Sequence, residues 1–494
     1  MKKLLFSSAL ISAFILSSCN LLSTPKKNSS SASSSGESSN TSATTNSNSG
    51  SNQSSSSSGA SSSSLLPDVP GDKYTILLYI CGSDLESDYA EVTEYYDPYS
   101  GETYEFDGKG MAVSDISEIL AVPNKPEGLN IVIATGGSSK WTKNSTYGHY
   151  SENYDIRNDK IQYHHVHNGK IYLDQTLPQA SMGSASTLTS FLNYGFANYP
   201  AEKYGVILWN HGAGMGGVCV DENKDDDRLT NAEVQSAISS AKSTSHITDK
   251  LEWIGYDACL MGVTDIAATN ATNFNYMVAS EELEAGAGWD YDGWLPTLYQ
   301  NLDVSTPTLL SKICSTFVEE SAEDFDSPSD NDATLAVYDL SKADTFITEF
   351  NNWSANFTTQ TQFNNLKTIY KSSLRFGDQY HGSQYLYGAV DAVDFLNRIK
   401  KNSSFSSIDN TKLLTAIDNM VVTSEYGKYY SSKSSKPCGI TMFFAGDETV
   451  GSYPPQISRT NYTENDSIFA KWRKFNLDYG TFFDDEDNDS GWSW

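Results

Sequence analysis

The chain has 494 residues, and its 62 Asp and Glu against 33 Lys and Arg give a formal net charge of −29 at pH 7. This charge argues against a nucleic-acid partner and against binding of the folded part to an anionic membrane, because both need clustered cations. With 30 Tyr, 21 Phe and 9 Trp, the chain is too aromatic for wholesale disorder. We expect most of it to fold, into about two or three domains, and to act as a monomer.

The N-terminus carries a targeting signal. An apolar run from Leu4 to Leu16 follows two lysines and is short for a membrane span. It ends in Leu16-Ser17-Ser18-Cys19, which resembles the lipobox of bacterial lipoproteins. The resemblance implies that residues 1–18 are a cleaved signal peptide and that Cys19 is lipidated, which anchors the protein to a bacterial cell membrane outside the cytoplasm. The alternative is an ordinary secretory signal that happens to contain a cysteine.

A serine-rich stretch follows the cysteine. More than half of the residues from Ser29 to Ser64 are Ser, and such a segment cannot bury enough apolar surface to offset its chain entropy. We therefore expect residues 19–65 to be a flexible tether, in which about 36 residues would span roughly 30–35 Å. The opposite end, residues 481–494, is expected to be a solvated acidic tail.

The body alternates strand and helix patterns. Five short apolar runs are typical of buried strands: Tyr74–Cys81, Leu129–Ala134, Tyr204–Trp209, Leu251–Tyr256 and Tyr276–Ala279. Helices are expected between them, after the turn at Gly82–Glu86 and over Gly183–Ala197, Asn231–Lys242 and Leu260–Thr269. This alternation predicts an α/β fold with a largely parallel sheet covered by helices on both faces.

The second half of the chain carries weaker patterns. Helices are expected over Thr306–Glu320 and Ile468–Phe475, and strands over Ala333–Tyr338 and Gly439–Phe444. We therefore divide the body into a main domain, residues 66–305, and a smaller C-terminal α/β portion, residues 306–480, that supports it.

Two of the predicted strand ends carry nucleophilic chemistry. His211 follows the third strand and Cys259 the fourth, and function gathers at the carboxyl ends of parallel strands. An imidazole can take the proton of a thiol that attacks a carbonyl and can later protonate the leaving amine. Gly212 and Gly214 leave room for a substrate and can offer an N–H to an oxyanion. The alternative is a buried, inert Cys259 and a hydrogen-bonded loop histidine.

These stretches carry a resemblance to a known family. Asn210-His211-Gly212-Ala213-Gly214, Tyr256-Asp257-Ala258-Cys259 and Ala279-Ser280-Glu281-Glu282 resemble the clostripain family of cysteine peptidases. The resemblance implies a caspase-like fold and a His/Cys dyad with no obligatory third member. It makes His211 the general base and Cys259 the nucleophile of an endopeptidase, with the N–H groups of Gly212 and Cys259 as the oxyanion hole. The competing hypothesis is a non-catalytic surface lipoprotein, an adhesin or binding module on a peptidase-like scaffold.

The resemblance also implies a substrate preference. Family members typically cleave proteins or peptides after Arg or Lys, and Asp257 matches the position implicated in binding that basic side chain. A carboxylate there could pair with a guanidinium or ammonium group, although it could instead satisfy backbone donors of its own loop. The chain departs from the family in Glu284-Ala285-Gly286, where Pro often precedes the glycine.

The loop between the His and Cys strands is a candidate for self-cleavage. Relatives are often cut there, and here the loop contains the polar run Asp221–Arg228, which shows no strand or helix pattern and is expected to be exposed. Its basic residues, Lys224 and Arg228, are the expected cleavage points.

No sequence pattern predicts a metal site. His164, His165 and His167 lack partners at ligand spacing, and the run from Asp221 departs from an EF-hand at the positions of Asp226 and Ala232. A looser Ca²⁺ site stays open, because some family members depend on calcium. Apart from Cys19, five scattered cysteines form no disulfide framework and no CxxC pair, so at least one thiol is unpaired.

Overall fold

The computed structural model describes residues 71–96, 103–143, 155–325, 327–377, 388–444 and 468–480. The predicted signal peptide, Cys19, the serine-rich tether and the acidic tail lie outside these residues. Within the described residues, no helix combines the length and apolarity needed to cross a membrane.

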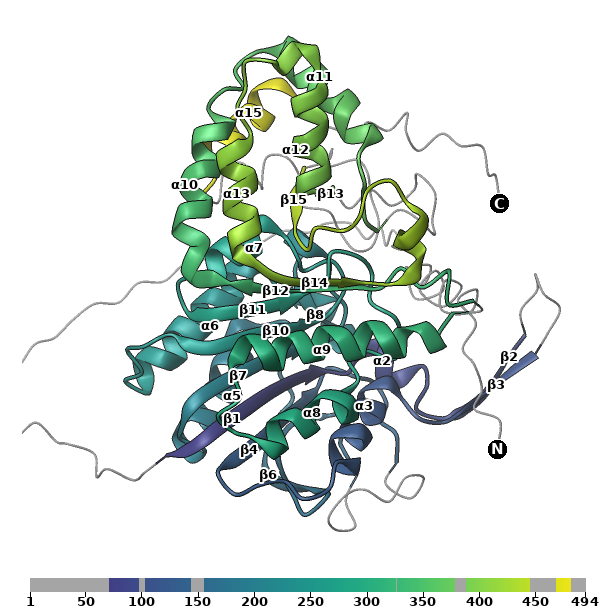
Figure 1. Ribbon diagram of the computed structural model, residues 1–494. Helices are drawn as coiled ribbons and strands as arrows, with labels where there is room; N and C mark the ends of the chain where they lie inside the picture. Colours follow the sequence, from purple (N-terminus) through teal and green to yellow (C-terminus); the bar gives the residue numbers. More distant parts are fainter. Residues whose placement is uncertain are drawn as a thin grey trace, which may run out of the picture. The chain divides into compact units, whose positions relative to one another are not determined.

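A nine-stranded mixed sheet organises the described part of the chain (Figure 1). In spatial order its strands are β14 (Val421–Tyr426), β12 (Thr334–Asp339), β11 (Phe274–Ala279), β10 (Leu251–Asp257), β7 (Ala201–Trp209), β1 (Asp72–Cys81), β4 (Leu129–Gly136), β5 (Lys160–His167) and β6 (Lys170–Pro178). The five strands predicted from apolar runs form its parallel centre, and the outer strands pair antiparallel.

Helices cover both faces of this sheet, as the continuous apolar strands predict. One face packs under α3 (Met111–Ala121), α8 (Tyr291–Gln300) and α9 (Thr306–Glu320). The opposite face packs under α5 (Ala185–Asn198), α6 (Asn231–Thr244) and α7 (Thr264–Asn270). The central strand β1 serves both cores, since Leu77 and Tyr79 face one and Ile76 and Leu78 face the other.

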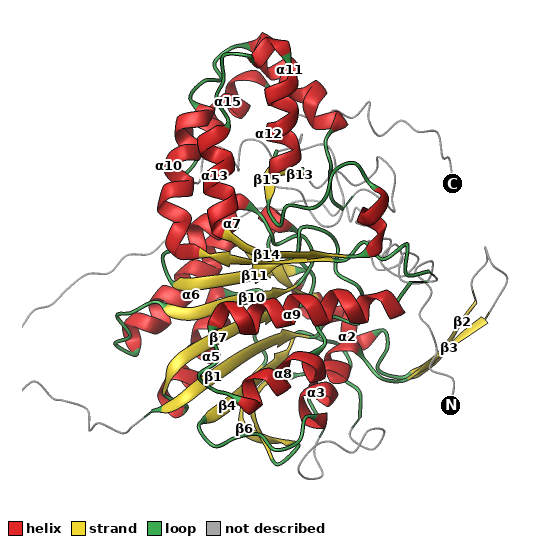
Figure 2. Cartoon of the chain, in the orientation of Figure 1, coloured by secondary structure: helices red, strands yellow, loops and turns green. Residues whose placement is uncertain are grey.

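The C-terminal half also contributes to the main sheet. Its strands β12 and β14 extend that sheet beyond β11. The remainder forms a helical group of α10 (Ala343–Ser354), α11 (Gln360–Ser372), α12 (Ala392–Lys401), α13 (Thr411–Met420) and α15 (Ala470–Tyr479) around a small sheet of β13 (Ala389–Asp391) and β15 (Thr441–Phe443) (Figure 2). Arg473 of α15 forms a fully buried ion pair with Asp265 of α7, which ties this group to the main sheet.

Two predictions about local structure were wrong. The helix expected from Leu260 begins only at Thr264, because the N–H groups of Leu260 and Gly262 bond the carbonyls of Glu282 and Ser280 instead of starting a helical turn. Leu260 itself has a left-handed φ of 64°.

The polar run from Asp221 is also structured. It lies in a hairpin of β8 (Val218–Asp221) and β9 (Asp227–Leu229), with a 3-10 turn between them. Two further elements, α2 (Ser83–Ser87) and the ribbon of β2 (Val92–Tyr96) and β3 (Thr103–Asp107), follow β1.

Candidate active site

The sheet register brings the predicted dyad residues to one edge. β7 and β10 are parallel neighbours in which Trp209 lies opposite Asp257. His211 comes two residues after Trp209 and Cys259 two residues after Asp257, so both leave the sheet at the same level. The two loops touch, because a Cβ on Gly212 would lie 2.2 Å from the Cys259 carbonyl oxygen and 3.0 Å from its nitrogen. Only glycine allows this approach, which puts the two backbone N–H groups proposed for an oxyanion hole in neighbouring strand-end loops.

Asn210 fixes the path of the histidine loop. Its side-chain amide donates to the Cys81 carbonyl at the end of β1 at 2.7 Å, and its oxygen accepts from the Val220 N–H in β8 at 2.8 Å. The His211 carbonyl accepts a hydrogen bond from the Cys219 N–H at 3.2 Å. The loop that carries His211 is therefore held on both sides, by β1 and by the β8–β9 hairpin.

An aspartate holds the His211 ring. Asp84, in the short helix α2 at the end of β1, lies 2.8 Å through Oδ1 from His211 Nε2. Burial lowers the pKa of His211, but the charge of Asp84 and its hydrogen bond outweigh burial and raise the pKa above its usual value. Burial likewise opposes ionisation of Asp84, yet His211 brings its pKa down to about 2.

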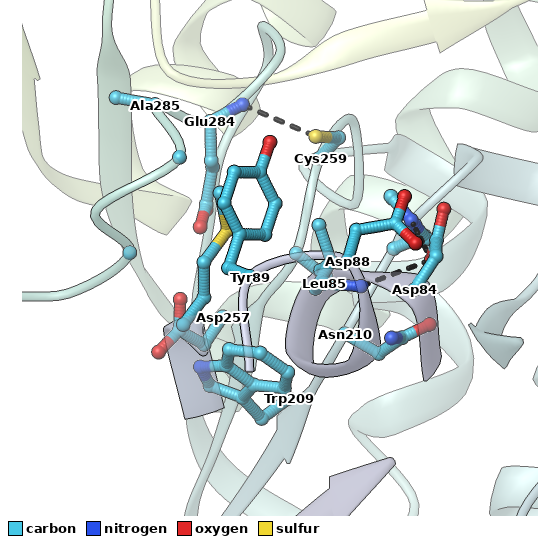
Figure 3. Close-up of a pocket in the computed structure, with 15 residues that line it drawn as sticks. Asp84, Leu85, Asp88, Tyr89, Trp209, Asn210, Asp257, Cys259, Glu284 and Ala285 are labelled. Atoms are coloured by element: carbon cyan, nitrogen blue, oxygen red, sulfur yellow. Dashed lines mark hydrogen bonds and ion pairs between the residues drawn. The ribbon is translucent and has the colours of Figure 1, made fainter. Parts of the chain in front are cut away.

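The Cys259 thiol lies beside the backbone of Glu284 (Figure 3). Its Sγ accepts a hydrogen bond from the Glu284 N–H at 3.2 Å. Burial, followed by the negative charge of Glu284, raises the pKa of Cys259 to about 12. The group is therefore a thiol at neutral pH unless a base takes its proton or the negative charge nearby is neutralised.

Both side chains line one open pocket, whose empty space, including solvent at its mouth, is about 730 Å³. Its wall is built from α2 and the residues after it, the start of α3, the ends of β7 and β10 with their following loops, and the segment after β11. The lining residues are Asp84, Leu85, Asp88, Tyr89, Met111, Trp209, Asn210, His211, Asp257, Ala258, Cys259, Glu284, Ala285, Gly286 and Gly288. Figure 3 shows Asp257 and Trp209 on the side of the pocket away from Cys259.

The floor of this pocket is acidic and buried. Asp257 is 4% exposed and Glu284 is 8% exposed. Burial raises the pKa of Asp257 to about 7, although the Tyr291 hydroxyl donates to its Oδ2 at 2.9 Å. Burial and the charge of Asp257 raise the pKa of Glu284 well above its usual value. Two buried carboxyls in contact with each other form a site suited to a cationic group.

The sequence did not single out two of these groups. Asp84 was assigned only to a turn, although β1 is parallel to β7 and its end therefore meets the same edge as His211. Glu284 was noted only as a departure from the family pattern. The strand order, which a single sequence does not reveal, was the missing signal for Asp84.

The other candidate residues lie elsewhere. His164 is buried in β5 beside the Thr135 hydroxyl, and burial lowers its pKa to about 3. His165 pairs with Asp174 at 2.6 Å between β5 and its neighbour β6.

Lys224 and Arg228 lie in the β8–β9 hairpin and are half-buried. Asp221 of the same hairpin accepts hydrogen bonds from the N–H groups of Met182 and Asn223. The five described cysteines, Cys81, Cys219, Cys259, Cys314 and Cys438, form no disulfide with one another.

Comparison with known proteins shows the family of the chain. The model of the clostripain family (Peptidase_C11) matches residues 62–485. Clostripain of Hathewaya histolytica is 23% identical over 394 residues, which cover 70% of this chain and 74% of that protein.

The fold is similar to solved structures of C11 proteases. A secreted C11 cysteine protease from Bacteroides thetaiotaomicron, iotapain, superposes with a TM-score of 0.54 and 16% identity over 81% of this chain and 99% of that chain. An inactive zymogen C11 protease from Parabacteroides distasonis superposes with a TM-score of 0.51 and 16% identity, over 84% of this chain and 100% of that chain. The expected caspase-like α/β fold is confirmed. Because the family model spans most of its length, the chain belongs to the clostripain family and is a cysteine endopeptidase.

Proposed function

We propose that the protein is a surface-anchored endopeptidase that cleaves after Arg or Lys by means of His211 and Cys259. The observation that carries the proposal is the pair of buried carboxyls, Asp257 and Glu284, on the floor of the pocket that both dyad residues line. A basic side chain fills such a site with charge-assisted hydrogen bonds, whereas an acidic or apolar side chain leaves the two buried carboxyls without a cation.

His211 acts as the general base. Asp84 accepts the Nε2 hydrogen and so fixes the tautomer, and Nδ1 is the nitrogen that we assign to proton transfer. The ring takes the Cys259 proton, and the thiolate attacks the scissile carbonyl carbon to form a C–S bond. The N–H groups of Gly212 and Cys259 stabilise the oxyanion, and the imidazolium returns the proton to the leaving amine. Water then hydrolyses the thioester with His211 again as base.

Substrate binding assists ionisation of the thiol. The charge of Glu284 opposes thiolate formation at Cys259. A guanidinium or ammonium bound beside Asp257 and Glu284 cancels that field and lowers the pKa of Cys259 once the substrate is in place. Basic substrates therefore improve the reactivity of the nucleophile as well as binding.

We infer attachment to the cell surface from the N-terminal sequence. A lipid at Cys19 would anchor the enzyme, and the serine-rich tether would span roughly 30–35 Å, enough for the enzyme to reach proteins near the membrane. The wild-type chain and a Cys259→Ala variant test the mechanism on peptides that differ only in one residue, Arg, Lys, Leu or Glu.

We expect wild type to cleave the Arg and Lys peptides and Cys259→Ala to fall to background, since losing a nucleophile costs about 10⁶-fold in kcat. A chloromethylketone with a basic side chain should label wild type at Cys259 and leave the variant unlabelled. Equal cleavage of all four peptides would overturn the specificity, and full activity of Cys259→Ala would overturn the mechanism.

A further inference from the structure

Three side chains with metal-ligand chemistry meet where the small C-terminal sheet joins the main sheet. Glu281 follows β11, Asp391 ends β13, and Cys438 precedes β15. One ligand atom from each lies within 4.8 Å of the other two. The three residues come from sequence positions more than 150 residues apart at the extremes, so only the tertiary structure brings them together.

Backbone donors hold two of these side chains in place. Glu281 accepts from the Gly439 N–H through Oε2 at 2.7 Å. Asp391 accepts from the N–H groups of Cys438 and Asp394, each at 2.7 Å. These bonds fix the carboxylates before any ligand arrives, as the orienting contacts of metal ligands do.

The remaining carboxylate oxygen points to a missing partner. Glu281 is 1% exposed, and its Oε1 is buried with no hydrogen-bond partner among the described residues. Asp391 is fully buried. Within the described ranges, no lysine or arginine is ion-paired with either carboxylate. Buried carboxylates without a cation or donor are costly, and a bound cation would remove that cost.

We propose that Glu281, Asp391 and Cys438 bind one divalent metal ion of the zinc type. The thiol selects for zinc or cadmium over calcium and magnesium, which prefer ligand sets made only of oxygen. Binding releases the Cys438 proton and leaves a thiolate–metal bond. A backbone carbonyl or a water completes the tetrahedral set; the Ile440 carbonyl lies 3.2 Å from Cys438 Sγ.

The ion would act as a structural cross-link. It would fasten the β13–β15 sheet to the end of β11, directly before the segment that carries Glu284 and the pocket wall. It does not depend on the proposed peptidase chemistry, because neither His211 nor Cys259 is a ligand.

Metal titration of the full chain tests the site. The parent protein carries Cys259→Ala, so that the proposed nucleophile cannot bind metal. Glu281→Gln and Cys438→Ser each remove one ligand, and Cys314→Ser is the control because it removes a buried thiol of α9 in the opposite core. After treatment with EDTA, each protein is titrated with ZnCl2 or CdCl2, and metal content, thermal unfolding and near-ultraviolet absorbance are measured.

The parent and Cys314→Ser should hold about one zinc ion per chain, unfold at a higher temperature with zinc, and show a cadmium–thiolate charge-transfer band. Glu281→Gln and Cys438→Ser should lose at least about tenfold in zinc affinity, and Cys438→Ser should lose the band. If Cys438→Ser does not fold, as judged by circular dichroism, Glu281→Gln decides. Absence of zinc binding by the parent at micromolar metal, or equal binding by all four proteins, would overturn the proposal and leave the cluster held by shared protons.

Discussion

Two aspartates at the site differ in charge because their surroundings differ. Asp84 and Asp257 are both buried, and burial alone would raise the pKa of each. His211 compensates Asp84 and brings its pKa down to about 2, whereas burial raises the pKa of Asp257 to about 7. In the proposed mechanism, an ionised Asp84 orients the base, and Asp257 binds the cationic side chain of the substrate.

Replacing Asp257 with Asn should damage cleavage after basic residues. A charge-assisted hydrogen bond is worth about 1.5–3 kcal/mol, so kcat/KM for an Arg peptide should fall by about 10- to 150-fold, while the Tyr291 hydroxyl still has an acceptor. In wild type, KM for that peptide should fall as pH rises through about 7 and Asp257 ionises; in the variant this pH dependence should be lost. Unchanged kinetics on the Arg peptide would remove Asp257 from substrate recognition.

The raised pKa of Asp257 also predicts how the stability of the protein changes with pH. The pKa of this carboxyl is about 7 in the folded protein and about 3.9 in the unfolded chain, so the folded state binds more protons between these values. The contribution of Asp257 to the free energy of unfolding should therefore decline from about pH 4 to pH 7. The Asp257→Asn variant should show a smaller decline over this range, because it lacks the titrating group. Urea unfolding at several pH values measures it, and a slope that the substitution leaves unchanged would contradict the raised pKa.

Asp84→Asn should change the pH profile of the reaction. Without the carboxylate, the pKa of His211 falls, so the acid limb of kcat/KM moves to lower pH. Loss of one charge-assisted bond that fixes the ring should lower kcat by about 10- to 100-fold. Asp88→Asn is the matched control, because Asp88 lines the same pocket and its charge raises the pKa of His211 less than Asp84 does, so it should shift the profile less. An identical acid limb in wild type and Asp84→Asn would show that Asp84 does not act through the histidine.

At the level of elements, the β8–β9 hairpin is the most consequential. In its first strand, β8, the Val220 N–H donates a hydrogen bond to the Asn210 side chain. Its turn contains Asp226, whose charge helps to raise the pKa of His211. The hairpin therefore lies beside the base as a folded element, which makes it a harder target for proteolysis than the exposed run expected from the sequence. Cleavage there requires local opening.

Wild-type protein should nevertheless cut itself in this hairpin, after Lys224 or Arg228, and should do so slowly. Expressed without residues 1–65 and run on a denaturing gel, wild type should yield two fragments, and Cys259→Ala should stay whole. Replacing both Lys224 and Arg228 with Ala should also keep the chain whole while sparing the dyad. A wild-type chain that stays intact yet is fully active would show that cleavage is not the switch.

At the level of the whole molecule, the net charge of −29 suits an enzyme that repels anionic surfaces and attracts basic substrates. We propose that a lipid at Cys19 holds the protein at a membrane. Cys19→Ser should therefore move the protein from the membrane fraction to the medium and abolish metabolic labelling with palmitate, with kcat/KM on short peptides unchanged. Continued membrane association of Cys19→Ser would contradict lipid anchoring at this residue.

The sequence by itself determined the strands of the central sheet and the edge at which they end. Continuous apolar runs can be buried only between two helical layers, so the five parallel strands were predictable, and His211 and Cys259 had to emerge at the same edge. The helix at Leu260 was predicted wrongly because Leu260 and Gly262 bond to Glu282 and Ser280, which is a contact between distant parts of the sequence. The open loop at Asp221 was predicted wrongly because the pairing of β8 with β9 is irregular and leaves no clear local pattern.

Only the tertiary structure decided which polar groups share an environment. Asp84 reaches His211 because β1 lies beside β7, and Asp257 meets Glu284 because the segment after β11 folds over the end of β10. The cluster of Glu281, Asp391 and Cys438 likewise depends on where the C-terminal half docks. Burial and charge compensation are properties of a residue's neighbours, and a single sequence does not specify neighbours that are distant along the chain.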